Sequence, residues 1–284
     1  MAGNVHSVAS KRRTAKAPVI TAAAELTRPE VAEAAGGGVK SAGRALDLLE
    51  DLAVNGPSPL HVLATRMKLP KSSLHALLRT MEGRGWIDTD ATGTVYRLGI
   101  HSLLVGSAYL DGDLIVNRTG PVLDDLAAAT GEAVHLGRLE GSHVVYTAKR
   151  ESLHPLRMFS AVGRRLPAYA TALGRALLAE RSDEHVLSTL PPVLEQTTVR
   201  TTTKPAALLA ILEQARQRGY AVEDEESCIG ISCFAVALPF STPAQDAISI
   251  AVPHARLDDA LRTRVVEELL AARTRLTQQP FPRA

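Results

Sequence analysis

The chain has 284 residues, of which 45% are hydrophobic, 22% are charged and 4% are aromatic, and its formal net charge is +2. These values are typical of a globular protein long enough for two domains, and they exclude an aromatic-rich surface for stacking on bases. No apolar run approaches the ~20 residues of a membrane span, and the N-terminus lacks a signal core, so we expect a cytoplasmic protein with no membrane partner.

The charge is unevenly divided along the chain. Residues 1–99 hold 13 Lys and Arg against 9 Asp and Glu, a balance of +4, whereas residues 100–284 hold 19 against 21, a balance of −2. A basic N-terminal end is compatible with a nucleic-acid partner without proving one. Cys228 and Cys233 are the only cysteines, which fits a reducing compartment without a disulfide framework.

Residues 1–39 are predicted to form a disordered tail, basic at first, then Ala-rich, and ending in the glycines 36–38. The early cations are predicted to be solvated rather than to form a specific arm on DNA. These cations are Lys11, Arg12, Arg13 and Lys16.

Residues 40–99 carry the pattern of three short helices and a hairpin. The stretches "SAGRALDLLEDLA" and "SPLHVLATRM" each have one apolar helical face, and we expect Ser58 to cap the second helix with Pro59 at its first position. A third helix is expected from Pro70 after a very tight turn. The strand-like runs "WID" and "TVYRL" then flank the turn signal "TDATG". This order predicts a winged helix-turn-helix over residues 40–99.

The third predicted helix has two distinct faces. One is apolar, with Leu74, Leu77, Leu78 and Met81 at helical spacing; the opposite face, Ser72, His75, Ala76 and Arg79, carries no acid. A surface without acids suits a helix in the major groove, where Arg can bond guanine and Ser or His can bond several bases. An ordinary three-helix core with a chance polar face is the alternative. The predicted DNA-binding residues are Lys71, Ser72, Ser73, His75 and Arg79.

Residues 100–284 are predicted to hold a helical linker over 100–117 and a ligand-sized domain over 118–284. Residues 100–130 have a helical pattern, in which Pro121 suggests a break. Beyond them, strand hairpins alternate with helices, which predicts an α+β domain on an antiparallel sheet.

Small residues in "ATALGRALL" leave the backbone approachable at a helix start, where the helix dipole favours an anion. Close packing of Ala172 and Gly174 on a sheet explains the same pattern equally well.

An enzyme is disfavoured because no catalytic constellation is assembled. "GISCF" lacks the final glycine of a nucleophile elbow, and Cys233 among apolar neighbours reads as a buried thiol. The histidines have no metal-binding spacing, and the acidic run 223–226 is read as a solvated turn rather than a cation site. We therefore predict no catalytic residue, no metal and no cofactor.

Three stretches together resemble the IclR family of bacterial transcriptional regulators: "LPKSSLHALLRTMEGRGWIDTD…YRLG", "VGRRLPAYATALGRALLA" and "RGYAVEDEESCIGISCFAVALPF…AISIAV". The resemblance covers about residues 40–275. It implies a winged helix that binds double-stranded operator DNA, a GAF- or profilin-like domain that binds a small effector, often an organic or aromatic acid, and a homodimer or dimer of dimers. Repression is favoured over activation. The alternative is a small-molecule sensor or interaction module without sequence-specific DNA binding.

The resemblance also places the effector contacts residue by residue. Two departures from other members, Glu223 in place of an aspartate and Ala251 in place of a second serine, argue against transferring any known member's effector. The effector-binding residues so implied are Leu156, Met158, Ala172, Leu173, Gly174, Glu223, Cys233 and Ser249.

Overall fold

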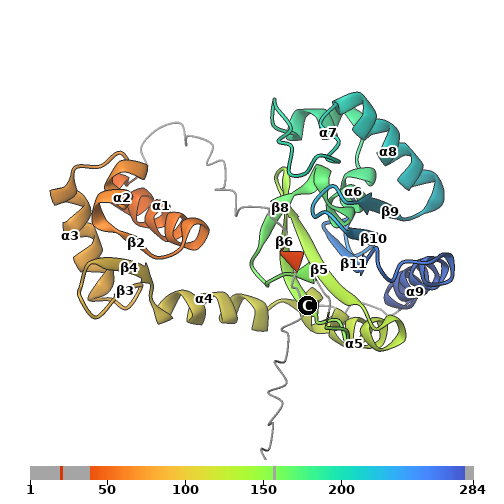
Figure 1. The fold of residues 1–284 in the computed structure, drawn as a ribbon, viewed down its shortest axis with the longest axis horizontal. Coiled ribbons are helices and arrows are strands. Elements are labelled where there is room, and N and C mark those ends of the chain that lie inside the picture. Colours follow the sequence, from red (N-terminus) through yellow and green to blue (C-terminus); the bar gives the residue numbers. More distant parts are fainter. Residues whose placement is uncertain (1–19, 22–38, 156–157, 279–284) are drawn as a thin grey trace, which may run out of the picture.

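The computed structural model describes residues 20–21, 39–155 and 158–278 of the chain. Two lobes lie at the ends of a single helix, α4 (Ile100–Asp111), as Figure 1 shows. The smaller lobe precedes α4 along the chain and the larger follows it, which agrees with the predicted α+β architecture. Within the predicted tail only Ile20–Thr21 and Val39 are described. Ile20–Thr21 is strand β1, which pairs in parallel with β7 (Met158–Phe159), and the rest of the tail lies outside the described residues.

The smaller lobe is a winged helix-turn-helix with its own core. Leu48, Leu63, Leu74 and Leu78 are fully buried in it. Its elements are α1 (Lys40–Asn55), β2 (Ser58–Pro59), α2 (Leu60–Arg66), α3 (Lys71–Glu82), β3 (Ile87–Thr89) and β4 (Val95–Leu98).

The prediction that Ser58 and Pro59 begin the second helix was wrong. They form β2, which pairs antiparallel with β4, and the helix starts at Leu60. Proline is compatible with an edge strand, where its missing N–H faces no partner. The Ser58 hydroxyl accepts a hydrogen bond from Arg66 at 2.8 Å, and Arg66 also holds the buried Asp51 of α1 at 2.6 Å. This network fixes α2 against α1.

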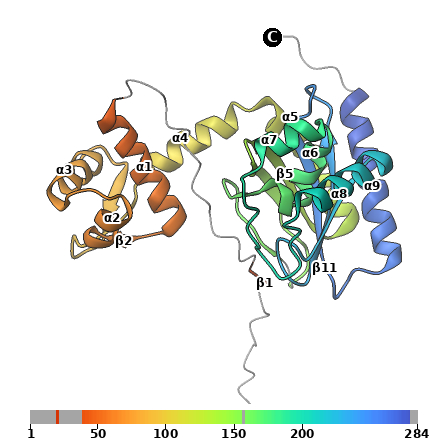
Figure 2. The same ribbon diagram turned by 90° about the horizontal axis from the view of Figure 1, so that it is seen from above.

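The larger lobe is a six-stranded antiparallel sheet in the order β8-β6-β5-β11-β10-β9, covered on both faces. One face packs on α6 and, beyond it, α8; the other packs on α5 and α9 (Figure 1). Seen from above in Figure 2, α9 lies at the side of the larger lobe that is farthest from the smaller lobe. Its elements are α5 (Leu114–Thr130), β5 (Ala133–Glu140), β6 (His143–Arg150), β8 (Arg165–Pro167), a 3-10 turn (Ala168–Ala170), α6 (Ala172–Ala179), α7 (Asp183–Thr189), α8 (Pro205–Arg218), β9 (Ala221–Asp224), β10 (Ile231–Leu238), β11 (Asp246–Pro253) and α9 (Asp259–Gln278).

The helix break expected at Pro121 falls elsewhere. Gly112 ends α4, and Asp113 caps α5 by accepting the N–H groups of Ile115 and Val116 at 2.9 and 3.0 Å. Pro121 lies inside α5, which continues because its apolar face is buried against the sheet and α9. The predicted linker is therefore a helix and a tight corner rather than one continuous segment.

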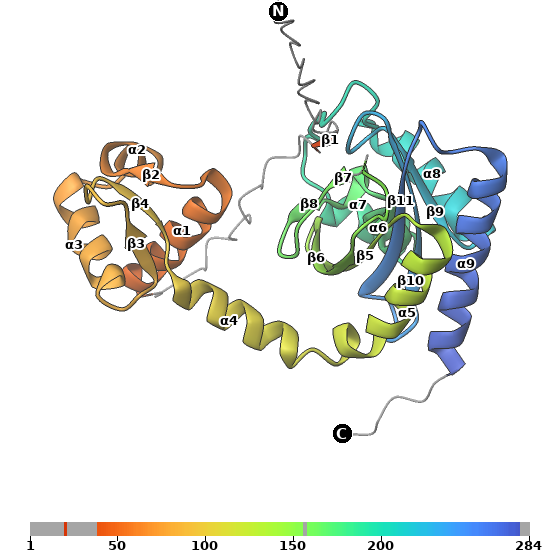
Figure 3. The same ribbon diagram turned by 60° about the horizontal axis from the view of Figure 1, so that its bottom comes forward.

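Both ends of α4 are fixed to their lobes. At its start, the N–H of Gly99 donates to the Trp86 carbonyl at 2.8 Å and the His101 ring meets Trp86 edge-on. At its end, Arg138 of β5 donates to the Tyr109 hydroxyl at 2.9 Å and forms an ion pair with Asp113. The helix between these anchors spans the gap between the lobes, as Figure 3 shows.

Candidate functional site

The α3 helix has the two faces that the sequence predicted. Leu74, Leu78 and Met81 are buried in the small core, and Leu77 is half-buried. The opposite face is exposed to solvent, and so are all the predicted DNA-binding residues, which are Lys71, Ser72, Ser73, His75 and Arg79. The structure thus leaves these five side chains accessible to a partner.

Cations flank α3 at both ends. Pro70 precedes the helix and provides no side-chain cap, so the first-turn N–H groups beside Lys71 are open to an anion such as phosphate. Lys68, held at φ +54°, is exposed just before this point, and Arg84 is exposed just after the helix. In the wing, by contrast, Arg97 pairs with Asp88 at 2.9 Å. Exposed cations therefore lie beside both ends of α3.

Three of the predicted effector residues lie beneath α6. Cys233 of β10 lies between Glu223 of β9 and Ala251 of β11 in the strand register, and Ser249 lies between Ala235 and His135. Glu223, Cys233 and Ser249 are all buried on the sheet face that packs against α6. The structure thus brings them to one face. Met158 lies in β7, and Leu156 is outside the described residues.

The start of α6 corrects part of the sequence prediction. Ala172, Leu173 and Gly174 are buried, but the Gly174 N–H donates to the side chain of Thr171 at 3.1 Å and is therefore engaged in capping the helix. A Cβ added to Gly174 would lie 2.2 Å from the Ala168 carbonyl oxygen. Close packing therefore explains Gly174, although its neighbour is the 3-10 turn rather than the sheet.

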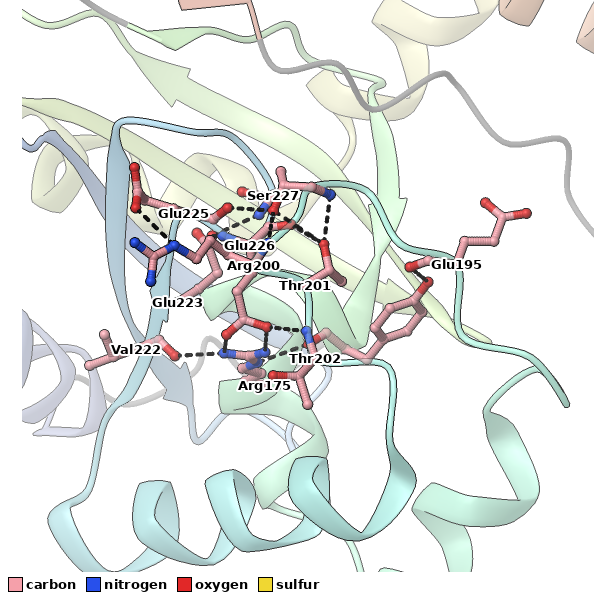
Figure 4. Close-up of polar contacts among 12 residues, drawn as sticks. Arg175, Glu195, Arg200, Thr201, Thr202, Val222, Glu223, Glu225, Glu226 and Ser227 are labelled. Atoms are coloured by element: carbon pink, nitrogen blue, oxygen red, sulfur yellow. Dashed lines mark hydrogen bonds and ion pairs between the residues drawn. The ribbon is translucent and has the colours of Figure 1, made fainter.

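Glu223 is the most unusual group beneath α6. Its side chain is fully buried, and burial raises its pKa to about 7 against the lowering effect of the Ser227 N–H and Arg175. Figure 4 shows the surrounding contacts. Arg175 of α6 holds Glu226 with two hydrogen bonds of 2.7 Å, and Glu226 in turn accepts the N–H of Thr202 at 2.6 Å. The turn after β9 is thereby tied to both α6 and the loop before α8.

His135 was missed because its partners are distant in sequence. Its Nε2 lies 2.8 Å from the Ser160 hydroxyl, and its ring stacks obliquely on Tyr146 with centroids 4.9 Å apart. Burial, aided by the nearby Lys149 charge, lowers the His135 pKa to about 4. A neutral imidazole therefore borders the same buried face as Ser249.

A cavity of about 330 Å³ lies at the other end of α6. It is separate from Ala172, Leu173 and Gly174, which lie at the first turn of the helix. Five of its ten lining residues are alanines and three are charged, and none of them is a predicted effector residue. Its lining residues are Ala176, Ala179, Glu180, Ala215, Arg216, Gly219, Tyr220, Ala221, Ala237 and Arg273.

Ser232, His254 and Asp224 have the residue types of a hydrolytic triad but not its geometry. The Ser232 hydroxyl and the Asp224 carboxylate both contact the same ring nitrogen, His254 Nε2, at 2.8 Å, whereas a triad places them on opposite nitrogens. Burial also raises the pKa of Cys233 well above its usual value, with the Glu223 charge adding to the effect, which opposes a nucleophilic thiolate.

The acidic run 223–226 does not converge on a cation. Asp224 contacts His254, Glu225 accepts the Gly230 N–H at 2.8 Å, and Glu226 is held by Arg175. Among the described residues, no group of three or more His, Cys, Asp or Glu could hold a metal. None of the described helices is long and apolar enough to cross a membrane.

The likeness to known proteins extends over both lobes. Residues 41–91 match the model of the IclR helix-turn-helix domain and residues 107–277 match that of the bacterial transcriptional regulator IclR C-terminal domain. The regulator BhcR of Paracoccus denitrificans is 32% identical over 87% of this chain and 89% of its own length. The transcriptional repressor IclR of Escherichia coli is 34% identical over 82% of this chain and 87% of its own.

A solved IclR-type regulator from Alicyclobacillus acidocaldarius has the same fold, with a TM-score of 0.75 over 85% of this chain and 98% of that one, at 24% identity. These matches cover the DNA-binding lobe and the effector lobe together. The chain belongs to the IclR family of transcriptional regulators and combines its helix-turn-helix and effector domains.

Proposed function

We propose that this regulator binds a pseudo-palindromic operator as a homodimer or a dimer of dimers, and that a small organic acid beneath α6 changes its affinity for that operator. Repression is favoured over activation, and the site of action is the cytoplasm. The exposed, acid-free face of α3 is the observation that carries the proposal, because phosphate repels acids and Arg79 can read guanine.

The homodimer is supported by α4. Its exposed apolar side chains include Leu103, Leu104 and Val105, which are 57–62% exposed, and none of its residues is buried by the described part of the chain. A helix this apolar is stable in water only with a partner on it. We infer that the partner is α4 of a second copy, since a twofold pair of α3 helices matches a palindromic site.

Coupling between the two lobes is supported by Arg138. It donates to Asp246 of β11 at 2.8 Å while holding Tyr109 and Asp113 at the far end of α4. Asp246 and Ser249 share β11, and Arg138 and His135 share β5. A ligand that moves these strands would therefore move the anchor of α4. Couplings of this kind typically amount to ~1–3 kcal/mol.

The first test is fluorescence-anisotropy binding to the upstream DNA of the gene and to a scrambled duplex across a salt series. We expect tighter binding to the upstream duplex, with a difference that persists as salt rises. Equal binding to both duplexes at every salt concentration would contradict a site in this DNA.

The second test separates base reading from phosphate contact. Arg79→Ala should cost ~1–3 kcal/mol on the preferred duplex and relax its specificity, whereas Lys71→Ala should weaken all duplexes alike. An equal loss for Arg79→Ala on preferred and random duplexes would remove its assigned role.

A further inference from the structure

The cavity at the C-terminal end of α6 is a space that the proposed effector site does not use. Its volume of about 330 Å³ lies within the ~300–1,000 Å³ that is usual for small-molecule pockets. Four of its alanines are buried, and each belongs to a different element of the larger lobe: Ala176 of α6, Ala215 of α8, Ala221 of β9 and Ala237 of β10. Their short side chains leave room for a small ligand.

One of the three charged side chains that line the cavity is already engaged within the chain. Arg216 donates to the carbonyl groups of Ala179 and Arg181 at 2.9 and 3.0 Å. Its guanidinium also pairs with Asp183 at 2.8 Å and with Glu213 at 3.1 Å. Arg216 therefore fixes the end of α6, and its charge is balanced without a ligand.

The other two charged side chains, Glu180 and Arg273, are held only loosely. Nη2 of Arg273 on α9 lies 3.7 Å from Oε1 of Glu180, which is too long for a hydrogen bond. Neither charged group makes a hydrogen bond within the part of the chain that the structure describes. The two side chains are 33% and 38% exposed, and an ion pair of this kind adds little to stability. The cavity is thus lined by a cation and an anion that both keep their hydrogen-bonding capacity.

A ligand that carries both charges suits this pair. A carboxylate matches the guanidinium of Arg273, but a simple carboxylate would also lie beside the like charge of Glu180. A simple amine matches Glu180 and would lie beside Arg273. An α-amino acid holds an ammonium and a carboxylate a short distance apart, so it meets both groups and leaves neither charge opposed. No unbalanced charge remains among the lining residues for its side chain.

We propose that this cavity binds a free α-amino acid with a small uncharged side chain. The carboxylate of the amino acid pairs with Arg273, its ammonium pairs with Glu180, and its side chain lies against the buried alanines. This site is separate from the effector site proposed beneath the first turn of α6, and the inference does not depend on that site.

Isothermal titration calorimetry on the full chain at neutral pH tests the inference with two matched sets of probes. L-valine is compared with 3-methylbutanoate and 2-methylpropylamine, and L-leucine with 4-methylpentanoate and 3-methylbutylamine. Each analogue lacks either the ammonium or the carboxylate of its parent. At least one amino acid is expected to bind about tenfold or more tightly than both of its analogues, because each analogue leaves one charged group without its partner.

Variants of the lining residues locate the site. Glu180→Gln and Arg273→Gln each remove one charge at nearly constant size, and each should weaken binding of that amino acid about fivefold or more. Ala179→Leu fills the cavity without a change of charge and should also weaken binding. Arg264→Gln on α9 and Glu184→Gln on α7 change exposed charges away from the cavity and should leave the affinity unchanged. Circular dichroism checks that every variant is folded.

Three results would overturn the inference. The first is no binding of either amino acid to the wild-type chain. The second is an analogue that matches its parent amino acid in affinity and loses that affinity in Arg273→Gln, since a single charge would then suffice. The third is an amino-acid affinity that persists in both Glu180→Gln and Arg273→Gln. Binding of a carboxylate analogue that persists in Arg273→Gln belongs to another site and is subtracted.

Discussion

The helices α4 and α6 are both apolar, yet their surroundings are opposite. In α6, residues 172–178 are all buried within the chain, while α4 has no buried residue in the part of the chain that the structure describes. Apolar composition thus indicates that a helix will be covered, but not which molecule covers it. The difference places α6 in the core of the larger lobe and leaves α4 uncovered by the described part of the chain, which is where the proposed dimer contact lies.

The largest effect is expected from charging α4. The double substitution Leu103→Glu and Leu104→Glu should convert the dimer to monomers and weaken operator binding on the order of a hundredfold, because unpaired charges would be buried at the interface. Sedimentation velocity and operator anisotropy measure both effects. Leu187→Glu on α7 charges a leucine that is 47% exposed and serves as the matched control. A double variant that remains dimeric would contradict the proposal that α4 forms the dimer interface.

Glycine-to-alanine substitutions compare how tightly α6 and α4 are packed within the chain. Gly174→Ala should destabilise the larger lobe by ~1–3 kcal/mol or more, since its Cβ would overlap the Ala168 backbone. A Cβ on Gly106 of α4 meets nothing within 4 Å, so Gly106→Ala should be neutral or stabilise by up to ~1 kcal/mol. Urea unfolding measures both. Similar changes for the two variants would mean that α4 is packed as tightly as α6.

The pH dependence of stability tests the buried environment beneath α6, where Glu223 lies. Because burial raises the Glu223 pKa from its ordinary 4.5 to about 7, the folded state binds a proton more tightly than the unfolded state. The free energy of unfolding should therefore fall as pH rises from about 4.5 to 7, on the order of 2–3 kcal/mol for this group.

Glu223→Gln removes this dependence, so its stability relative to wild type should increase over that pH range. His135 acts in the opposite direction: its pKa is lowered from 6.5 to about 4, so its contribution is lost as pH falls through that window. The difference between wild type and variant isolates Glu223. Glu267→Gln, on an exposed position of α9, is the control, and a flat difference curve would contradict the Glu223 assignment.

The smallest effect is expected where α4 meets the sheet. Arg138→Gln should speed amide hydrogen exchange over residues 109–116 by the equivalent of ~1 kcal/mol, because the hydrogen bonds to Tyr109 and Asp113 are lost. Arg150→Gln removes an ion pair between β6 and α5 without touching α4, and should leave that exchange unchanged. Equal exchange rates in wild type and Arg138→Gln would show that Arg138 does not stabilise the end of α4.

Much of the fold could be predicted because its signals are local. The apolar stripe of α3, the turn before β4 and the hairpin of β5 and β6 depend on neighbouring residues, and the structure has all three. Ser58 and Pro59 were misassigned because β2 exists only through a strand more than thirty residues later. The break at Asp113 had a local capping signal that Pro121 obscured.

The sequence predicted which residue types form the candidate site. It did not predict their burial or their hydrogen-bond partners. Family resemblance indicated Glu223, Cys233 and Ser249, and the register brings them to one face. The burial of Glu223 and the His135–Ser160 contact depend on segments far apart in sequence, so no local pattern contains them.

The firm attachment of α4 at both ends makes it a lever. Twelve residues at 1.5 Å per residue give an arm of roughly 18 Å. A tilt of about ten degrees at the Arg138 end would displace the Trp86 end by roughly 3 Å, close to the ~3.4 Å spacing of successive base pairs. A tilt too small to disturb the core of the larger lobe would thus be enough to shift α3 by about one base pair relative to its half-site on the operator.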